Sequence, residues 1–206
     1  MRLQQYLNEG TWSYNDMVSL IKANCKPFLK DWQSTYRYSF LYSGREWFND
    51  FDMRAVRKDR NPQSTPSDIH EWIDDWFYKK FGVRARSNVV FGTFNKNDAE
   101  NYGEPFMIFP IDKYMMLSSN KVEDLYLTLG KYLRRYDRKF EMITYEFRLR
   151  AGDINIDEVK TRIIDFLNKS NYKKNILNLN EQMVICKKYY MIQINYQKEL
   201  KEDLLN

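Results

Sequence analysis

The sequence predicts a single α+β domain in which mixed or antiparallel sheets are flanked by helices. The chain has 206 residues, about the length of one domain. Hydrophobic residues make up 43% and charged residues 30%, a balance that supports a core and is not typical of disordered chains. Short apolar runs and amphipathic helical patterns both occur, without internal repeats or a linker. We therefore expect one domain over 1–206, with a helical N-terminal extension at 1–38, a core at 39–196 and a tail at 197–206.

Helical periodicity appears in several segments. In 11–31, Thr11 or Ser13 can cap an amphipathic helix that Pro27 interrupts. The clearest pattern starts at Thr65-Pro66, where a hydroxyl precedes a proline at the first helical position, and closes at Phe81-Gly82. Further helices are expected at 121–136, 157–167 and 198–205.

Strands are expected at shorter apolar or alternating runs, namely 39–44, 89–91, 106–111, 142–149, 182–186 and 189–195. The segment 142–149 alternates apolar and polar residues, which predicts a half-buried strand. The last two runs are split by Lys187-Lys188 and form either one bulged strand or a hairpin. Residues 45–64 show no steady period and are expected to be an irregular loop, a candidate lid or partner-binding arm. Residues 168–180 are expected to be a polar loop.

The charge of the chain is uneven. The formal net charge is +5 and the pI is about 9. The segment 131–150 holds seven basic and three acidic residues, which favours a polyanionic partner such as nucleic acid. A solvated helix face explains the same residues, because cations suit the C-terminal end of a helix. Both interpretations stay open.

Cysteine and histidine usage argues against two kinds of chemistry. Cys25 and Cys186 are far apart and outside any C-x-x-C pair, and the chain starts without a signal-peptide pattern, so we expect reduced thiols. His70 is the single histidine, so no His/Cys cluster is available and no metal is expected. It is either an ordinary boundary residue or a ligand contact. No apolar run approaches the roughly 18 residues that span a bilayer, so we expect a soluble protein.

The stretch 86–111 combines local order with possible chemistry. It reads as a strand ending at Gly92-Thr93, a polar turn, a short helix and a second strand. Asn95 or Asn97 can cap the helix, and Gly103 can stop it. A hydroxyl and a glycine at a strand end beside a helix start predict a small-molecule cleft.

Glu181 is the carboxylate of greatest interest. It precedes an apolar strand at the end of a polar loop. A carboxylate there, opposite Gly92 and Thr93, could stabilise positive charge that develops on a sugar. The alternative is a solvated loop residue.

Three segments stand in an order that resembles the ADP-ribosyltransferase fold: LYSG at 41–44, VVFGTFN with DAENYG at 89–103, and NEQMVICKKYYMI at 180–192. That family has an aromatic- and glycine-containing first strand, a central strand with Ser/Thr, and a late strand that opens with glutamate. The RKDRNP run, the FG-x-R-x-RS segment before the central strand and the F-P-I run also resemble small uncharacterised bacteriophage proteins associated with this fold.

The resemblance implies an ADP-ribosyltransferase-like fold and NAD as substrate, with no metal. Glu181 would be the catalytic glutamate that favours the oxocarbenium-like ribose. Thr93, with Gly92, would brace the NAD site. The first-strand position that often holds an arginine on the NAD phosphates is Ser43, and Arg45, on the same strand face, is the candidate to replace that arginine.

The resemblance also bears on aromatic residues and the acceptor. Tyr42, Tyr102 or Phe94 could stack on nicotinamide, or pack in the core. Leu179 stands where many arginine-modifying members carry Gln or Glu.

The first expectation is therefore an NAD-dependent ADP-ribosyltransferase-like phage protein that modifies a host protein or nucleic acid. It would act in the cytoplasm of the infected bacterial host, with association with the virion as an open alternative. A phage structural or host-interaction protein that keeps the fold without the chemistry is the second expectation. A nucleic-acid-binding module is the third.

Overall fold

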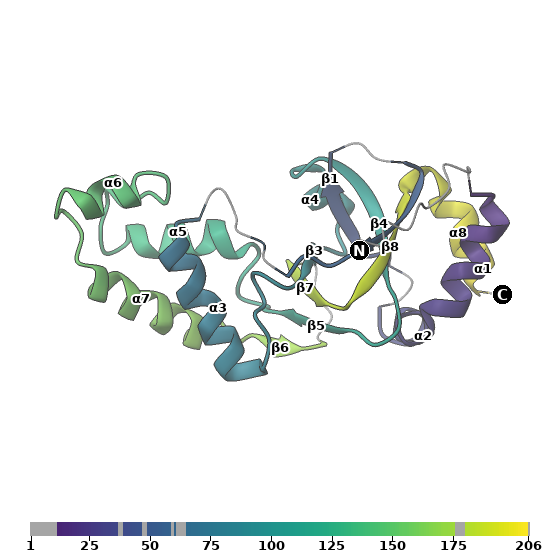
Figure 1. Ribbon diagram of the computed structural model, residues 1–206, viewed down its shortest axis with the longest axis horizontal. Helices are drawn as coiled ribbons and strands as arrows, with labels where there is room; N and C mark the ends of the chain where they lie inside the picture. Colours follow the sequence, from purple (N-terminus) through teal and green to yellow (C-terminus); the bar gives the residue numbers. More distant parts are fainter. Residues whose placement is uncertain are drawn as a thin grey trace, which may run out of the picture.

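The computed structural model describes residues 12–36, 39–46, 49–58, 60, 65–175 and 180–205. The helices are α1 (Tyr14–Asn24), α2 (Lys26–Ser34), α3 (Ser67–Phe81), α4 (Lys96–Glu100), α5 (Leu125–Arg134), α6 (Tyr145–Arg150), α7 (Ile156–Lys169) and α8 (Gln197–Leu205), with a 3-10 turn at Ile194–Tyr196. The strands are β1 (Tyr42–Arg45), β2 (Phe51–Ala55), β3 (Val90–Gly92), β4 (Glu104–Pro110), β5 (Met115–Ser118), β6 (Lys173–Lys174), β7 (Gln182–Ile185) and β8 (Lys188–Gln193). The strands lie in the middle, with α3, α5, α6 and α7 at one end and α1, α2 and α8 at the other (Figure 1).

The strands form two antiparallel sheets, and the α+β class is confirmed. One sheet has the order β1-β4-β8-β2 and the other β3-β7-β5-β6. A backbone bridge joins them: the N–H of Tyr42 donates to the carbonyl of Thr93 at 2.7 Å, and the N–H of Thr93 donates back to Tyr42 at 2.8 Å. The first strand of one sheet therefore lies beside the first strand of the other.

Several local signals for helix ends are confirmed. The Ser13 side chain caps α1 in a capping box with Asp16. A proline occupies the first turn of α2, which begins directly after Cys25. Gly82 closes α3 in the left-handed region at φ 77°. Asn95 caps α4. Thr11 lies outside the described residues.

The predicted strand at 142–149 is wrong, because its second half is helix α6. The alternation does not mark a buried face, since Ile143 is 87% exposed and Phe147 is 76% exposed. Met142, Tyr145 and Leu149, at helical spacing, are the residues that pack inward. The apolar residues of this segment fit both the two-residue period of a strand and the 3.6-residue period of a helix, and the helical period is the one that the structure adopts.

Two further expectations about the strands need correction. Residues 45–64 contain β2, an edge strand that pairs with β8, with Phe51 opposite Ile192. One-sided pairing buries little of β2, which explains its weak sequence pattern. The two runs around Lys187-Lys188 form neither a hairpin nor one bulged strand, because β7 and β8 belong to different sheets. Residues 47, 48, 59 and 61–64 lie outside the described part.

The C-terminal segment is not a detached tail. Leu200 and Leu204 of α8 are 0% and 3% exposed, and both belong to the core of the β1-β4-β8-β2 sheet. The Tyr14 hydroxyl donates to Asp203 at 2.6 Å, which joins α1 to α8. Cys25 is buried and Cys186 is half-buried, and both are free thiols, as expected. No helix in the described residues is long and apolar enough to cross a membrane.

Candidate functional site

Three neighbouring strands bring the motif residues together. β1 is joined to β3 by the Tyr42–Thr93 bridge, and β3 pairs with β7 so that Gly92 lies opposite Gln182. Thr93 follows Gly92, and Glu181 precedes Gln182. Because the two strands are antiparallel, Thr93 and Glu181 lie next to each other at the same end of this ladder. Segments that are far apart in the sequence therefore meet at one edge.

Most of the predicted site residues on β1 and β3 have structural roles, in core packing or in fixing the backbone. Tyr42 and Ser43 are 6% and 5% exposed, and Tyr42 belongs to the core. The Thr93 hydroxyl accepts the N–H of Asn95 at 3.1 Å, which fixes the turn into α4. A Cβ at Gly92 would lie 3.0 Å from both the Leu41 Cδ1 and the Tyr42 carbonyl oxygen. Close approach of β1 and β3 thus accounts for that glycine.

Glu181 is half-buried, and its carboxylate is incompletely paired. Its Oε1 atom is buried and has no hydrogen-bond partner among the described residues, and its backbone N–H donates to the carbonyl of Glu123 at 2.9 Å. Burial raises the pKa of Glu181 to about 7, although the charges of Arg86 and Arg60 and the backbone of Leu125 oppose the shift.

Two arginines, Arg86 and Arg60, act on this carboxylate, and Arg45 acts on Arg60. Arg86 is 7% exposed, and its Nε atom is buried without a hydrogen-bond partner in the described part of the chain. The guanidinium carbons of Arg60 and Arg86 lie 4.5 and 5.2 Å from the ring centroid of Phe91. Burial and the nearby charges of Arg86 and Arg45 lower the pKa of Arg60 to about 10, so it is still a cation at pH 7. The Nε atom of Arg45 is likewise buried without a described partner.

Tyr102 and Asp124 complete the side of the site toward α5. Tyr102 is 62% exposed, and its hydroxyl donates to the Asp124 carboxylate. Asp124 also caps α5, since it accepts the N–H of Leu127 at 2.7 Å. Burial, Asp124 and Glu181 all raise the pKa of Tyr102. The exposed Tyr102 ring is therefore free to contact a ligand, whereas the predicted stacking residues Tyr42 and Phe94 are buried in the core.

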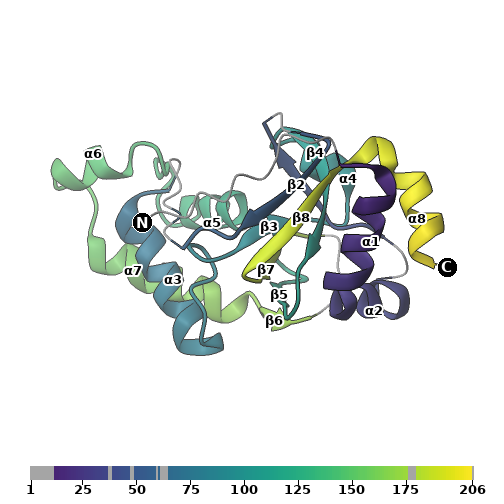
Figure 2. The same ribbon diagram turned by 45° about the vertical axis from the view of Figure 1, so that its right-hand side comes forward.

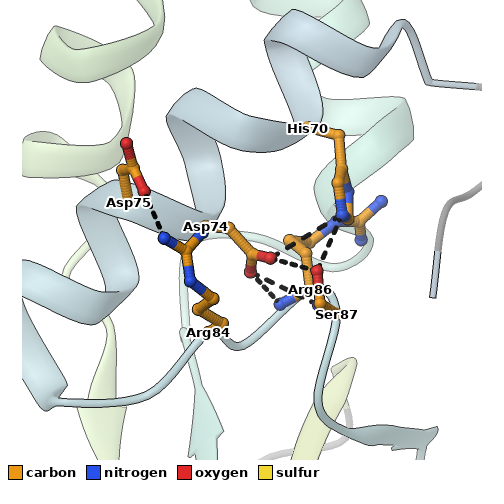
Figure 3. Close-up of polar contacts among 6 residues, drawn as sticks. All are labelled: His70, Asp74, Asp75, Arg84, Arg86 and Ser87. Carbon is orange, nitrogen blue, oxygen red and sulfur yellow. Dashed lines mark hydrogen bonds and ion pairs between the residues drawn. The ribbon is translucent and has the colours of Figure 1, made fainter. Parts of the chain in front are cut away.

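A buried polar cluster anchors the segment that carries Arg86 (Figure 3). Asp74 of α3 is 1% exposed, and its Oδ1 accepts the N–H of Arg86 at 2.6 Å and that of Ser87 at 3.3 Å. The Ser87 hydroxyl donates to Asp74 Oδ2 and lies 3.0 Å from His70 Nε2. His70 is thus a buried cluster member, 6% exposed, and not a boundary residue.

This Ser–His–Asp group is not arranged as a nucleophilic triad. In a triad the carboxylate orients the other ring nitrogen of the histidine, but Asp74 binds Ser87, and the Nδ1 atom of His70 is buried without a described partner. Burial and the charges of Arg86 and Arg60 lower the pKa of His70, with Asp74 acting in the opposite direction. The neutral imidazole and Asp74 therefore serve as a polar anchor.

The sequence indicated which segments form the candidate site, but it did not indicate every residue of the site. Arg60 lies in RKDRNP and Arg86 in the FG-x-R-x-RS segment before β3, both of which were part of the resemblance. Neither could be assigned a role, because only the packing of 60 and 86 around Phe91 brings them to Glu181. Asp124 was missed because the helix was expected to begin at 121, whereas α5 begins at Leu125 with Asp124 as its cap. Leu179 lies outside the described residues.

Two shallow hollows lie elsewhere. One of about 230 Å³ runs along α5 and is lined by Tyr126, Leu127, Gly130, Arg134, Phe140, Glu141, Met142 and Ile143. The other, of about 290 Å³, lies at the ends of β4 and β8. In the basic segment 131–150, Arg148 pairs with Asp137 at 2.7 Å and Arg150 with Glu146 at 4.0 Å. No group of three potential metal-binding side chains occurs within the described ranges.

Comparison with protein-family models, curated proteins and solved structures finds no match for this chain. The functional argument therefore depends on the geometry of the Glu181 site.

Proposed function

We propose that this protein cleaves the nicotinamide–ribose bond of NAD and transfers ADP-ribose to a host macromolecule, as an ADP-ribosyltransferase-like phage protein. The observation that carries the proposal is the placement of Glu181 beside Thr93 on the paired strands β7 and β3, of which β3 also adjoins β1. These are the three segments on which the sequence resemblance depends.

The chemistry requires one fixed negative charge. As the bond to ribose breaks, nicotinamide leaves with the electron pair and positive charge develops on the ribose, which the Glu181 carboxylate stabilises. An acceptor nucleophile then bonds to the ribose carbon and loses its proton to solvent. Only the ionised carboxylate supports this step. With a pKa of about 7 for Glu181, NAD cleavage should increase as the pH rises from 6 to 8.

The test is NAD consumption and labelling of a host lysate with radiolabelled NAD. We expect Glu181→Gln to lower the rate by about 100-fold or more, with an unchanged circular dichroism spectrum. Glu123→Gln is a matched control, because Glu123 is exposed and contacts Glu181 through its backbone carbonyl. A wild-type protein that neither binds nor consumes NAD would exclude the proposal.

A catalytically inactive host-interaction protein is the second candidate. The observation that favours it is the exposure of Ile143 and Phe147, at 87% and 76%, on and beside α6. Exposed apolar side chains of this size are typical of contact surfaces. Ser43, buried where an arginine is common, is consistent with this candidate. Host binding that survives Glu181→Gln but is lost in Phe147→Ser, in a chain without NAD turnover, would favour it over the transferase.

A further inference from the structure

The segment between α3 and β3 carries two arginines, Arg84 at the surface and Arg86 in the interior. Arg84 lies 3.0 Å from the exposed carboxylate of Asp75. Arg86, two residues later, turns inward beside His70, with its backbone fixed by Asp74 (Figure 3). Asp74 and Asp75 are neighbours on α3, but they bind the two arginines differently. Asp75 pairs with the Arg84 guanidinium at the surface, whereas Asp74 accepts the backbone N–H of Arg86 and leaves the buried Nε of Arg86 without a partner among the described residues.

The same anchor positions a second cation. The carbonyl of Ser87 accepts the backbone N–H of Arg60 at 3.4 Å, and Ser87 is held by both Asp74 and His70. Arg60 and Arg86 then lie against the one ring of Phe91. Two like charges are thereby held close together on a single aromatic side chain. Burial and the charge of Arg86 lower the pKa of Arg60.

The positive charge here exceeds the negative charge that faces it. Arg86, Arg45 and Arg57 all act on Arg60, and Arg86 and Arg60 act on Glu181. Three acids lie nearby, namely Glu181, Asp124, which binds Tyr102 and the backbone of α5, and Asp74, which binds Ser87 and the backbone of Arg86. An anionic ligand would reduce the repulsion among these arginines.

We propose that Arg86 and Arg60 bind the diphosphate group of a nucleotide-type ligand, and that Asp74 is the positioning residue for both. Guanidinium groups suit this role, since each presents a planar set of donors to phosphate oxygens. The buried, unpaired Nε of Arg86 is a donor available to such a ligand. Arg86 thus supplies, from the segment before β3, the cation that Ser43 does not provide on β1. The identity of the ligand as NAD rests on the proposed function, but diphosphate binding does not.

The experiment is calorimetric titration of the full chain with inorganic pyrophosphate, ADP-ribose and AMP. We expect pyrophosphate and ADP-ribose to bind and AMP to bind much more weakly, because it lacks the second phosphate. Arg86→Gln should weaken pyrophosphate binding by about tenfold or more, while Arg84→Gln should leave it within about twofold. Arg60→Gln, at a half-buried position, provides a second variant if Arg86→Gln fails to fold.

Because loss of the buried Asp74 carboxylate can also destabilise the fold, its positioning role is tested by pyrophosphate affinity and by coupling to Arg86. We expect Asp74→Asn to weaken pyrophosphate binding and Asp75→Asn to have little effect. When Asp74→Asn is combined with Arg86→Gln, the combined loss of affinity should be smaller than the product of the two single losses. Independent losses would show that Asp74 does not act through Arg86, and an unchanged affinity of Asp74→Asn would show that Asp74 acts only on stability; either result would overturn its positioning role.

The outcomes also separate this inference from the proposed function. Glu181→Gln should bind pyrophosphate at least as tightly as wild type, because a negative charge is removed. A chain that binds pyrophosphate through Arg86 but never consumes NAD excludes the transferase and keeps the diphosphate site. No pyrophosphate binding by wild type, or equal losses in Arg84→Gln and Arg86→Gln, would overturn the diphosphate site.

Discussion

At the residue scale, Glu181 combines burial with incomplete pairing. Its Oε1 atom is enclosed without a described partner, although Arg86 and Arg60 lie close enough to oppose the shift in its pKa. The protein holds a carboxylate where the neutral acid is favoured, which lowers stability near neutral pH. Such a residue is a candidate for chemistry, because a purely structural position would be filled more favourably by an amide or an apolar side chain.

The raised pKa of Glu181 predicts a pH-dependent gain of stability in Glu181→Gln. The folded-state pKa of Glu181 is about 7, above its ordinary value of 4.5, so the native state binds more protons between these values and loses stability as the pH rises through them. We expect the variant and wild type to be equally stable at pH 4.5. At pH 8 the variant should be more stable by about 2 kcal/mol.

Urea unfolding at the two pH values measures this difference. Glu123→Gln should show no pH-dependent gain, since its side chain is exposed. If Glu181→Gln were less stable than wild type at pH 8, attraction to the arginines would outweigh burial, and the site would be an ordinary ion pair.

At the element scale, the fit of α4 against β1 shapes one wall of the site. A Cβ at Gly44 would lie 2.0 Å from the Ala99 carbonyl oxygen and 2.9 Å from the backbone carbon of Tyr102. Gly103 adopts φ +125°, and a Cβ there would meet the Arg45 carbonyl oxygen at 2.5 Å. Both glycines let the backbone of the short helix lie directly on the strand that carries Ser43 and Arg45.

We expect Gly44→Ala to destabilise the protein by about 2 kcal/mol or more, because backbone atoms must move to admit the methyl group. Gly130→Ala is the matched control: Gly130 lies within α5 and a Cβ there meets nothing within 4 Å. That change should stabilise the protein by about 0.5–1 kcal/mol through helix propensity. Chemical denaturation measures both, and a neutral Gly44→Ala would contradict the tight packing of α4 on β1.

The elements that the sequence predicted best were those with local signals. Caps at Ser13 and Asn95 and the stop at Gly82 depend on side chains within a few residues of the helix end. Strand pairing depends on distant partners, so β2 was missed and β7 and β8 could not be assigned to separate sheets. The order of motifs indicated which strands carry the site, but only the Tyr42–Thr93 bridge places them side by side.

At the scale of the whole molecule, two hydrophobic cores share one wall. One core lies between the β1-β4-β8-β2 sheet and helices α1, α2 and α8, and the other lies among α3, α5 and α7. Alternate residues of the shared strands face opposite cores: Val184 and Met116 belong to the first, and Met183 and Leu117 to the second. The strands run between the two groups of helices in Figure 2. Glu181 stands at the start of β7, where the two cores meet.

Because β5 and β7 have one face in each core, neither core can open without exposing the other, and we predict a single cooperative unfolding transition. Native-state hydrogen exchange at increasing urea should give the same opening free energy for peptides from β8, in the first core, and α7, in the second. Val184→Ala and Met183→Ala should each lower both values by a similar amount, about 1–4 kcal/mol. The exposed Leu205→Ala, at 43% exposure, should change neither value appreciably. If α7 exchanged at markedly lower urea than β8, the helical end would unfold on its own. Glu181 would then lie at a hinge between two independent units, and not on a wall common to both.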